Sequence, residues 1–123
     1  MSKAKIVRDS DGLFWGIRFD CPGCRAAHGF REPHILPISN WRPPGETAES
    51  RGVANMDHWT FNGDFEKPVF GPSVLRRYQI EDEPQYVCHS FVGCNGAAPG
   101  QMIFLGDSTH ALAGQTVDLP DVD

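Results

Sequence analysis

The stretch that most constrains this chain is residues 86–92, which read YVCHSFV. Aromatic and β-branched side chains dominate it, and such residues favour a strand. Successive side chains of a strand point to opposite faces, so Cys88 and His89 must face opposite sides. We therefore expect a metal-binding thiol on one face of this strand and a titratable imidazole on the other.

The rest of the chain predicts a mainly β domain. Residues 5–8 and 13–19 are expected to form a hairpin, because residues 9–12 (DSDG) are typical of a turn. Further short strands are predicted at residues 58–61, 73–75, 102–105 and 115–120. Residues 107–114 predict one helical or 3₁₀ turn that ends at Gly114. No long helix is expected, which favours a small sandwich or a partly open barrel of short strands.

Length and composition fit one domain, residues 1–123. The chain has 123 residues, of which 40% are hydrophobic, so it can bury a core without splitting into two domains. Residues at about 38–55 are rich in Pro and Gly and are otherwise polar. We expect a long loop, lid or insertion there rather than a linker, with Trp41 holding it to the body of the domain.

Charge and hydropathy exclude some classes of protein. The net charge of −5 argues against non-specific binding of nucleic acid, and Arg76 and Arg77 alone do not make a basic stripe. No apolar run has membrane-spanning length, and the N-terminal residues lack the apolar core of a signal peptide. We therefore expect a cytosolic protein with no membrane partner, in which cysteines serve as thiols or metal ligands rather than disulfides.

Residues 21–24 (CPGC) form the strongest local motif. Two thiolates at this spacing, on a turn made tight by Pro22 and Gly23, can bind one tetrahedral zinc ion as a zinc knuckle. A zinc ribbon would repeat the motif, and this chain does not. The other ligands must come from a wider set, namely Cys88, Cys94, His28, His89 and His110. A turn with two free thiols is the alternative, whereas a thioredoxin-like site would need a βαβ unit.

His89 and His110 are the best candidates for catalysis. Asp107 lies three residues before His110, so the two would be neighbours on a helical turn. A carboxylate beside a histidine can orient its tautomer. Ser73 is a candidate nucleophile if His89 lies within hydrogen-bond reach, although a serine that only caps a turn is the simpler interpretation. Two other serines compete for the role, Ser90 and Ser108.

Several motifs follow one another in a specific order. They are the Cys-Pro-x-Cys pair with a nearby histidine, then WTFNGD at 59–64, KPVFGPS at 67–73, CHSFV at 88–92 and DSTHALAGQTV at 107–117. In this order the chain resembles a family of small phage and prophage proteins that are often mislabelled as ammonia monooxygenase. These proteins are similar to BubE, the peptidase component of bacterial ubiquitin-like conjugation operons.

The resemblance implies a small β-rich, zinc-binding peptidase in the cytosol of a bacterial host. It would cut after a ubiquitin-like tail, with serine as nucleophile. On this chain the Pro-Ser motif falls on Ser73, and the Cys-His motif falls on Cys88 and His89. The last motif falls on Asp107 and His110.

Our leading hypothesis is a hydrolase that acts on a ubiquitin-like protein or peptide. Ser73 would be the nucleophile and His89 the general base, while Asp107 or His110 would orient the base or polarise the scissile carbonyl. A closed four-ligand zinc leaves no open position and would be structural. The expected zinc ligands are Cys21, Cys24, Cys88 and His28.

Two alternatives remain open at this point. In the first, zinc is catalytic, with His89 and His110 as ligands and a bound water as nucleophile. In the second, the domain has no activity, and zinc stabilises a module that docks onto a phage or host protein through the Pro-rich loop.

Overall fold

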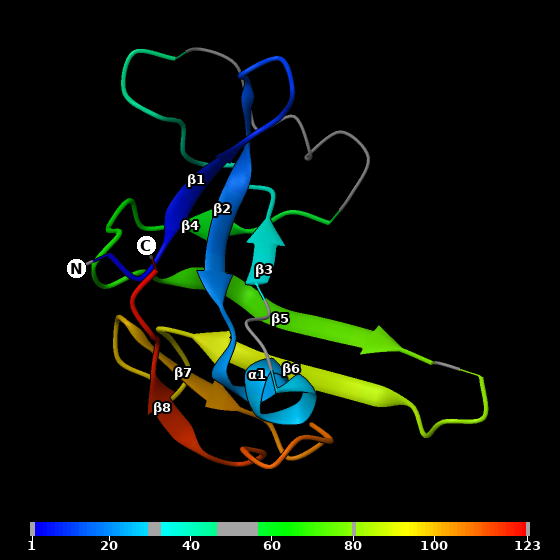
Figure 1. Cartoon of the computed structure of the whole chain (residues 1–123). Coiled ribbons are helices and arrows are strands. Elements are labelled where there is room, and N and C mark those ends of the chain that lie inside the picture. Colours follow the sequence, from blue (N-terminus) through cyan, green and yellow to red (C-terminus); the bar gives the residue numbers. More distant parts are fainter. Residues whose placement is uncertain (1, 30–32, 47–56, 80, 123) are drawn as a thin grey trace.

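The computed structural model describes residues 2–29, 33–46, 57–79 and 81–122. Two antiparallel sheets make up the fold, one in the order β1-β2-β3 and the other in the order β4-β5-β6-β7-β8 (Figure 1). The strands are β1 (Lys5–Arg8), β2 (Phe14–Asp20), β3 (Pro33–Leu36), β4 (Thr60–Phe61), β5 (Phe70–Tyr78), β6 (Tyr86–Val92), β7 (Gln101–Phe104) and β8 (Thr116–Asp118). The helix α1 (Pro22–His28) follows β2. The prediction of a small, mainly β fold is confirmed, and neither sheet closes into a barrel.

The predicted N-terminal hairpin is confirmed. β1 and β2 pair antiparallel, with Lys5 opposite Arg18. At the turn the amide of Gly12 donates to the carbonyl of Asp9 at 2.9 Å, and Gly12 has a φ of 79°. A glycine adopts this left-handed conformation without steric cost, so the turn forms where the sequence predicts it.

The helix α1 was not predicted, because residues 21–24 were interpreted as a tight turn. Cys21 is instead the N-cap, with its sulfur accepting from the Cys24 amide, and Pro22 opens the helix. Proline is well suited to this position, since the amide it lacks would have no partner inside the helix. Gly29, with a φ of 76°, ends the helix. Among the described residues, no helix has the length and the apolar character needed to cross a lipid bilayer.

The second sheet departs from the prediction in two places. β5 begins at Phe70 and runs for nine residues, longer than the predicted strand at 73–75. The pairing of β5 with β6 is irregular between Phe70 and Val74, and Pro72, which has no amide to donate to a neighbouring strand, lies in this irregular part. Residues 107–114 form turns rather than a helix, with Gly114 at a φ of 79°.

Aromatic side chains dominate the core. Phe70 is fully buried and stacks on Phe19 and Phe61, with ring centroids 5.5 and 5.1 Å apart. Trp41 packs edge-on against Phe14, Phe61 and Phe65. The tryptophan therefore holds the start of the Pro-rich stretch to the core, as predicted. The later part of that stretch, residues 47–56, lies outside the described residues.

Replacing Phe70 with alanine should lower the free energy of unfolding by about 3–5 kcal/mol, because it removes a buried ring that two others contact. Urea unfolding followed by fluorescence measures the change. Leu13→Ala is the matched control, since Leu13 is 40% exposed and should cost less than about 1 kcal/mol. Equal losses for the two variants would contradict the described core.

Candidate functional site

Strand β6 presents its side chains to two different environments. Cys88 is fully buried on the face that also carries Tyr86 and Ser90. His89 is half-buried and belongs to the opposite face. The structure thus separates the thiol from the imidazole, and a different cluster of side chains forms on each side.

On the buried side, four side chains bring one ligand atom each to a common point. They are Cys21, Cys24, His34 and Cys88, and their ligand atoms all lie within 4.8 Å of one another. The Sγ atoms of Cys21 and Cys88 are 3.6 Å apart, and Cys24 Sγ lies 3.7 Å from His34 Nε2. A tetrahedral zinc ion with ordinary bond lengths needs about 3.8 Å between sulfurs and about 3.6 Å from sulfur to nitrogen. The group therefore fits the dimensions of a Cys₃His zinc site.

Three short elements position these ligands. Cys21 follows the end of β2 and caps α1, whereas Cys24 lies in the first turn of α1. His34 lies in β3 directly opposite Phe19 of β2, and their rings stack with centroids 5.2 Å apart. Cys88 reaches the group from the other sheet. The metal group therefore spans the two sheets.

The imidazole in this group is His34, whereas the sequence analysis expected His28. His28 shares a hydrogen bond with Tyr78, its Nε2 lying 2.7 Å from the hydroxyl oxygen, and it is not part of the group. Cys94 also lies elsewhere, with its thiol donating to the carbonyl of Phe70. The sequence reasoning missed His34 because it lies ten residues beyond Cys24, outside any knuckle spacing. A prediction of the β2–β3 pairing would have found it.

The electrostatics of the three thiols favour a cation. Hydrogen bonds with Cys21 and Cys88 lower the pKa of Cys24. The hydrogen bond with Cys24 raises the pKa of Cys21 to about 12. Hydrogen bonds with these two cysteines, together with burial, raise the pKa of Cys88. Three thiolates at this distance repel one another, and a divalent cation would favour all three over thiols.

Two further groups donate to the sulfurs. The Tyr86 hydroxyl donates to Cys24 Sγ at 3.1 Å, and the Cys24 amide donates to Cys21 Sγ at 3.4 Å. Donors of this kind orient metal-bound thiolates and tune their basicity. The surroundings of the group, as well as its dimensions, suit a bound metal.

On the opposite face, Ser73, His89 and Asp107 form a hydrogen-bonded chain. Ser73 Oγ lies 3.2 Å from His89 Nε2. His89 Nδ1 lies 3.2 and 3.1 Å from the two carboxylate oxygens of Asp107. The His89 side chain is 23% exposed and that of Asp107 is 59% exposed, so solvent reaches the chain. A hydroxyl, an imidazole and a carboxylate in this order are the groups of a nucleophile, its base and the group that orients the base.

The segment after β7 fixes the position of Asp107. The amide of Leu105 donates to the carbonyl of His89 at 2.8 Å. The Ser108 hydroxyl accepts from the His89 amide and donates to the His89 carbonyl, at 3.0 and 3.1 Å. The amide of Thr109 donates to the carbonyl of Val87 at 2.9 Å. Residues 105–109 are therefore tied along β6, with Asp107 beside the ring of His89.

The other sequence candidates have different surroundings. Ser90 is fully buried, and the hydroxyl of Ser108 is engaged by the main chain of His89. His110 is only 6% exposed and packs edge-on against Phe104, with its Nδ1 accepting from the Leu112 amide. The turn thus brings Asp107, but not His110, to the ring of His89.

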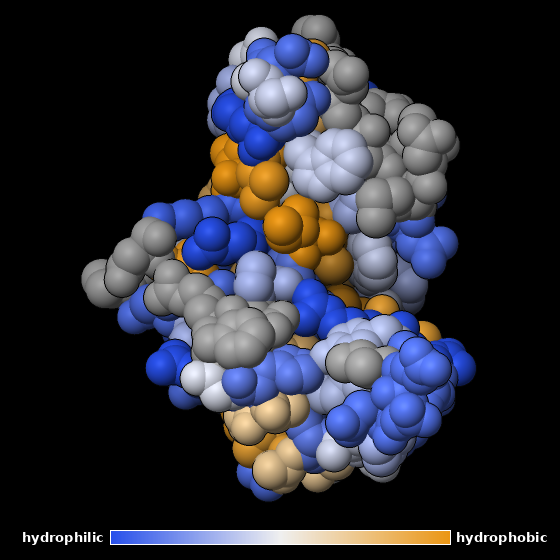
Figure 2. Space-filling model, turned by 45° about the vertical axis from the view of Figure 1, so that its right-hand side comes forward, coloured by the Kyte–Doolittle hydropathy of each residue, from blue (hydrophilic) through white to orange (hydrophobic). Residues whose placement is uncertain are grey.

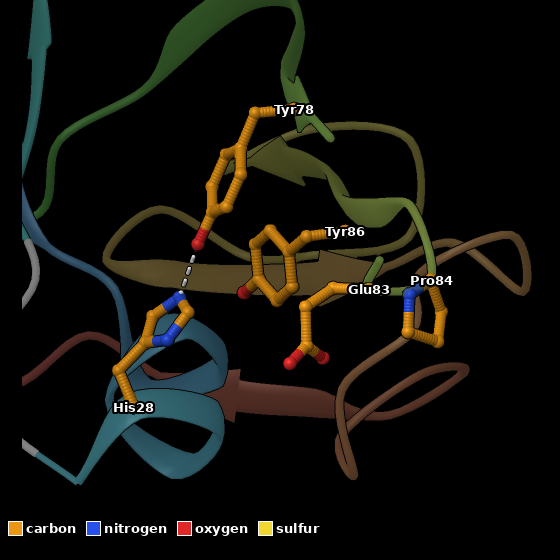
Figure 3. Close-up of a pocket in the computed structure, with 5 residues that line it drawn as sticks. All are labelled: His28, Tyr78, Glu83, Pro84 and Tyr86. Carbon is orange, nitrogen blue, oxygen red and sulfur yellow. Dashed lines mark hydrogen bonds between the residues drawn. The ribbon is translucent and has the colours of Figure 1, made fainter. Parts of the chain in front are cut away.

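A pocket of about 290 Å³ lies beside the metal group, lined by His28, Tyr78, Glu83, Pro84 and Tyr86 (Figure 3). Tyr86 links the pocket to the metal group through its bond to Cys24. Figure 3 shows Glu83 extending beside the ring of Tyr86, with His28 opposite. None of the five lining residues belongs to the Ser73–His89–Asp107 chain, so the two features are separate.

Comparison with protein families gives a match that covers most of the chain. The model of the family described as bacterial ubiquitination-like system serine protease (BubE) matches residues 1–98 of the chain. This range includes the four residues of the metal group, Ser73 and His89, whereas Asp107 lies beyond it. No curated protein and no solved structure matches the chain.

The geometry of the metal group predicts which substitutions release a metal. His34→Ala and Cys88→Ser should each lose most of the bound zinc and lower the melting temperature, because a structural zinc needs four protein ligands. Elemental analysis of the dialysed protein measures the zinc content. The matched controls are His28→Ala and Cys94→Ser, which should keep the wild-type content. Zinc loss in His28→Ala with retention in His34→Ala would reverse the assignment.

Proposed function

Since the chain belongs to the BubE family of bacterial ubiquitination-like system serine proteases, we propose that it is a serine peptidase that cuts a ubiquitin-like protein tail or its conjugates. The observation that carries this proposal is the chain from Ser73 Oγ through His89 to Asp107, with every contact at 3.2 Å or less. Family membership supplies the reaction class, and the geometry supplies the groups.

The three groups share the proton transfers of this reaction. The Asp107 carboxylate accepts a hydrogen bond from His89 Nδ1–H, which leaves Nε2 free to accept the proton of the Ser73 hydroxyl. Ser73 Oγ then attacks the scissile carbonyl carbon, and His89 donates the proton to the leaving amine as the C–N bond breaks. Water, activated by the same imidazole, hydrolyses the acyl-enzyme and regenerates the hydroxyl.

Zinc, when bound, has a structural role in this proposal. Cys21, Cys24, His34 and Cys88 would complete a tetrahedral coordination shell and leave no position for water. Such an ion would fix β6 and α1 relative to each other without taking part in the reaction.

The alternative of a catalytic zinc on His89 and His110 has less support. Both ring nitrogens of His89 already face Ser73 and Asp107. His110 is packed against Gly23 of α1 and against Phe104. The grouping of potential ligands among the described residues includes neither histidine.

The alternative of an inactive binding module predicts no relation between Ser73 and His89. Their side chains are instead within hydrogen-bond distance, although the residues lie 16 positions apart in the sequence. A carboxylate on the far nitrogen of the ring is a further coincidence that a purely structural role would not require. The peptidase proposal therefore explains more of the geometry.

A fluorophosphonate, which reacts with activated serines, should label Ser73. Mass spectrometry of the digested protein identifies the residue. Ser73→Ala should abolish labelling, and His89→Ala should slow it by about 10²–10⁴-fold because the base is lost. Ser10→Ala, in an exposed turn, is the matched control and should label normally. Labelling that persists in Ser73→Ala would show that another residue reacts.

Asp107→Asn should slow the labelling of Ser73 less than His89→Ala does. The side chain of Asp107 is 59% exposed, so we expect a loss of roughly 10-fold rather than the about 10⁴-fold that a buried triad aspartate can supply. The rate of labelling at fixed probe concentration measures the effect. Asp118→Asn, on the exposed end of the sheet, is the control. An Asp107 variant with the wild-type rate would remove this residue from the mechanism.

A further inference from the structure

The strand that carries Ser73 has an open edge next to it. β4 pairs only with Phe70 and Gly71 at the start of β5. From Val74 to Tyr78, β5 pairs with β6 alone among the described strands. Figure 1 shows the later half of β5 running well past β4. One side of this half-strand is therefore without a strand partner in the described part of the chain.

The hydrogen bonds of β6 reveal which main-chain groups of β5 point to that edge. The amides and carbonyls of Val87 and His89 bond to residues 105–109, on the far side of β6 from β5. Leu75 lies opposite His89, and Arg77 lies opposite Val87. In an antiparallel sheet, two residues directly opposite each other either exchange both main-chain hydrogen bonds or direct their N–H and C=O groups away from each other. Because the main-chain groups of Val87 and His89 point away from β5, these pairs are of the second kind. Leu75 and Arg77 thus present their N–H and C=O groups to the open edge.

The same edge begins at the candidate nucleophile. The carbonyl of Ser73 accepts a hydrogen bond from Trp59 Nε1 at 3.0 Å, so the edge is occupied at that residue. The next outward residues are Leu75 and Arg77, and no described residue bonds to their main-chain groups. Leu75 is also 42% exposed, and it lies across from His89.

The surface around the sheets offers apolar side chains. Figure 2 shows hydrophobic side chains gathered near the centre of one face of the molecule. The exposed large apolar residues in the described part of the chain are Leu13, Ile35 and Leu75. An unpaired strand edge together with an exposed leucine is the kind of surface that binds an extended peptide.

We propose that an extended segment of the substrate adds to the open edge of β5 as an antiparallel strand. This inference rests on the proposed peptidase function and specifies its substrate as an unfolded tail rather than a folded loop. In the antiparallel direction, the residues before the scissile bond pass Arg77, then Leu75, and the carboxyl end of the tail arrives at Ser73. Four residues of strand span about 13 Å, so a short tail suffices.

The test uses peptidyl diphenyl phosphonates that carry one to five alanine residues, which inactivate serine peptidases covalently. Strand addition predicts that the rate of inactivation rises about tenfold for each pair of residues added, because each pair brings new main-chain hydrogen bonds. N-methylation of the probe should lower the rate only at alternate residues, since every second amide faces β5. A rate independent of length, or insensitive to methylation, overturns the inference.

Enzyme variants give a second measurement. Leu75→Pro removes the outward amide and spares the bonds to β6. The increase of the inactivation rate with probe length should therefore disappear, while fluorophosphonate labelling of Ser73 persists. Leu75→Ala is the matched control: loss of the leucine side chain lowers the rate for every probe that reaches it, but the rate should still rise with probe length, because the amide remains. A Leu75→Pro enzyme that keeps the full gain overturns the inference. Failure of fluorophosphonate and of every phosphonate to label Ser73 in the wild-type protein would overturn the proposed function itself.

Discussion

The mutual repulsion that the three buried cysteines would have as thiolates is the constraint on which the rest of the structure depends. Cys21 and Cys24 come from the end of the three-stranded sheet and α1, whereas Cys88 comes from the middle of the five-stranded sheet. A cation bound to all three sulfurs would cancel this repulsion and would link the two sheets through its coordination bonds. Because Cys88 and His89 are consecutive, the same bond would also fix the position of the His89 imidazole, the proposed general base, on β6.

The fold was predictable where the signal was local. The alternation in residues 86–92 and the turn at 9–12 each depend on a few neighbouring side chains, and both elements form as expected. The helix α1 was not predictable from periodicity, because it has only seven residues and begins with a proline that also suits a turn. β3 has four residues and is defined mainly by its pairing with β2, a long-range property that no short pattern contains.

In the candidate site, too, the local motifs were readable from the sequence, whereas the contacts between distant residues were not. The motif CPGC and the strand with Cys88 indicate a metal group, but the identity of its imidazole depends on the antiparallel register that places His34 opposite Phe19. Ser73 and His89 were candidates by residue type and by the order of motifs in the family resemblance, but the contact between their side chains depends on the long-range pairing of β5 with β6. Asp107 and His110 were expected on one helical turn. The structure separates them, since residues 105–109 bond along β6 and direct Asp107 to the exposed face.

The contact between Gly23 and His110 has a consequence for how this sequence can diverge. The backbone of Gly23 is helical and has no need of glycine's freedom; what the site lacks is room, because a Cβ there would overlap the imidazole of His110. A larger residue at position 23 therefore requires the imidazole of His110 to move away or position 110 to carry a smaller side chain. Substitutions at the two positions are coupled, although they lie far apart in the sequence.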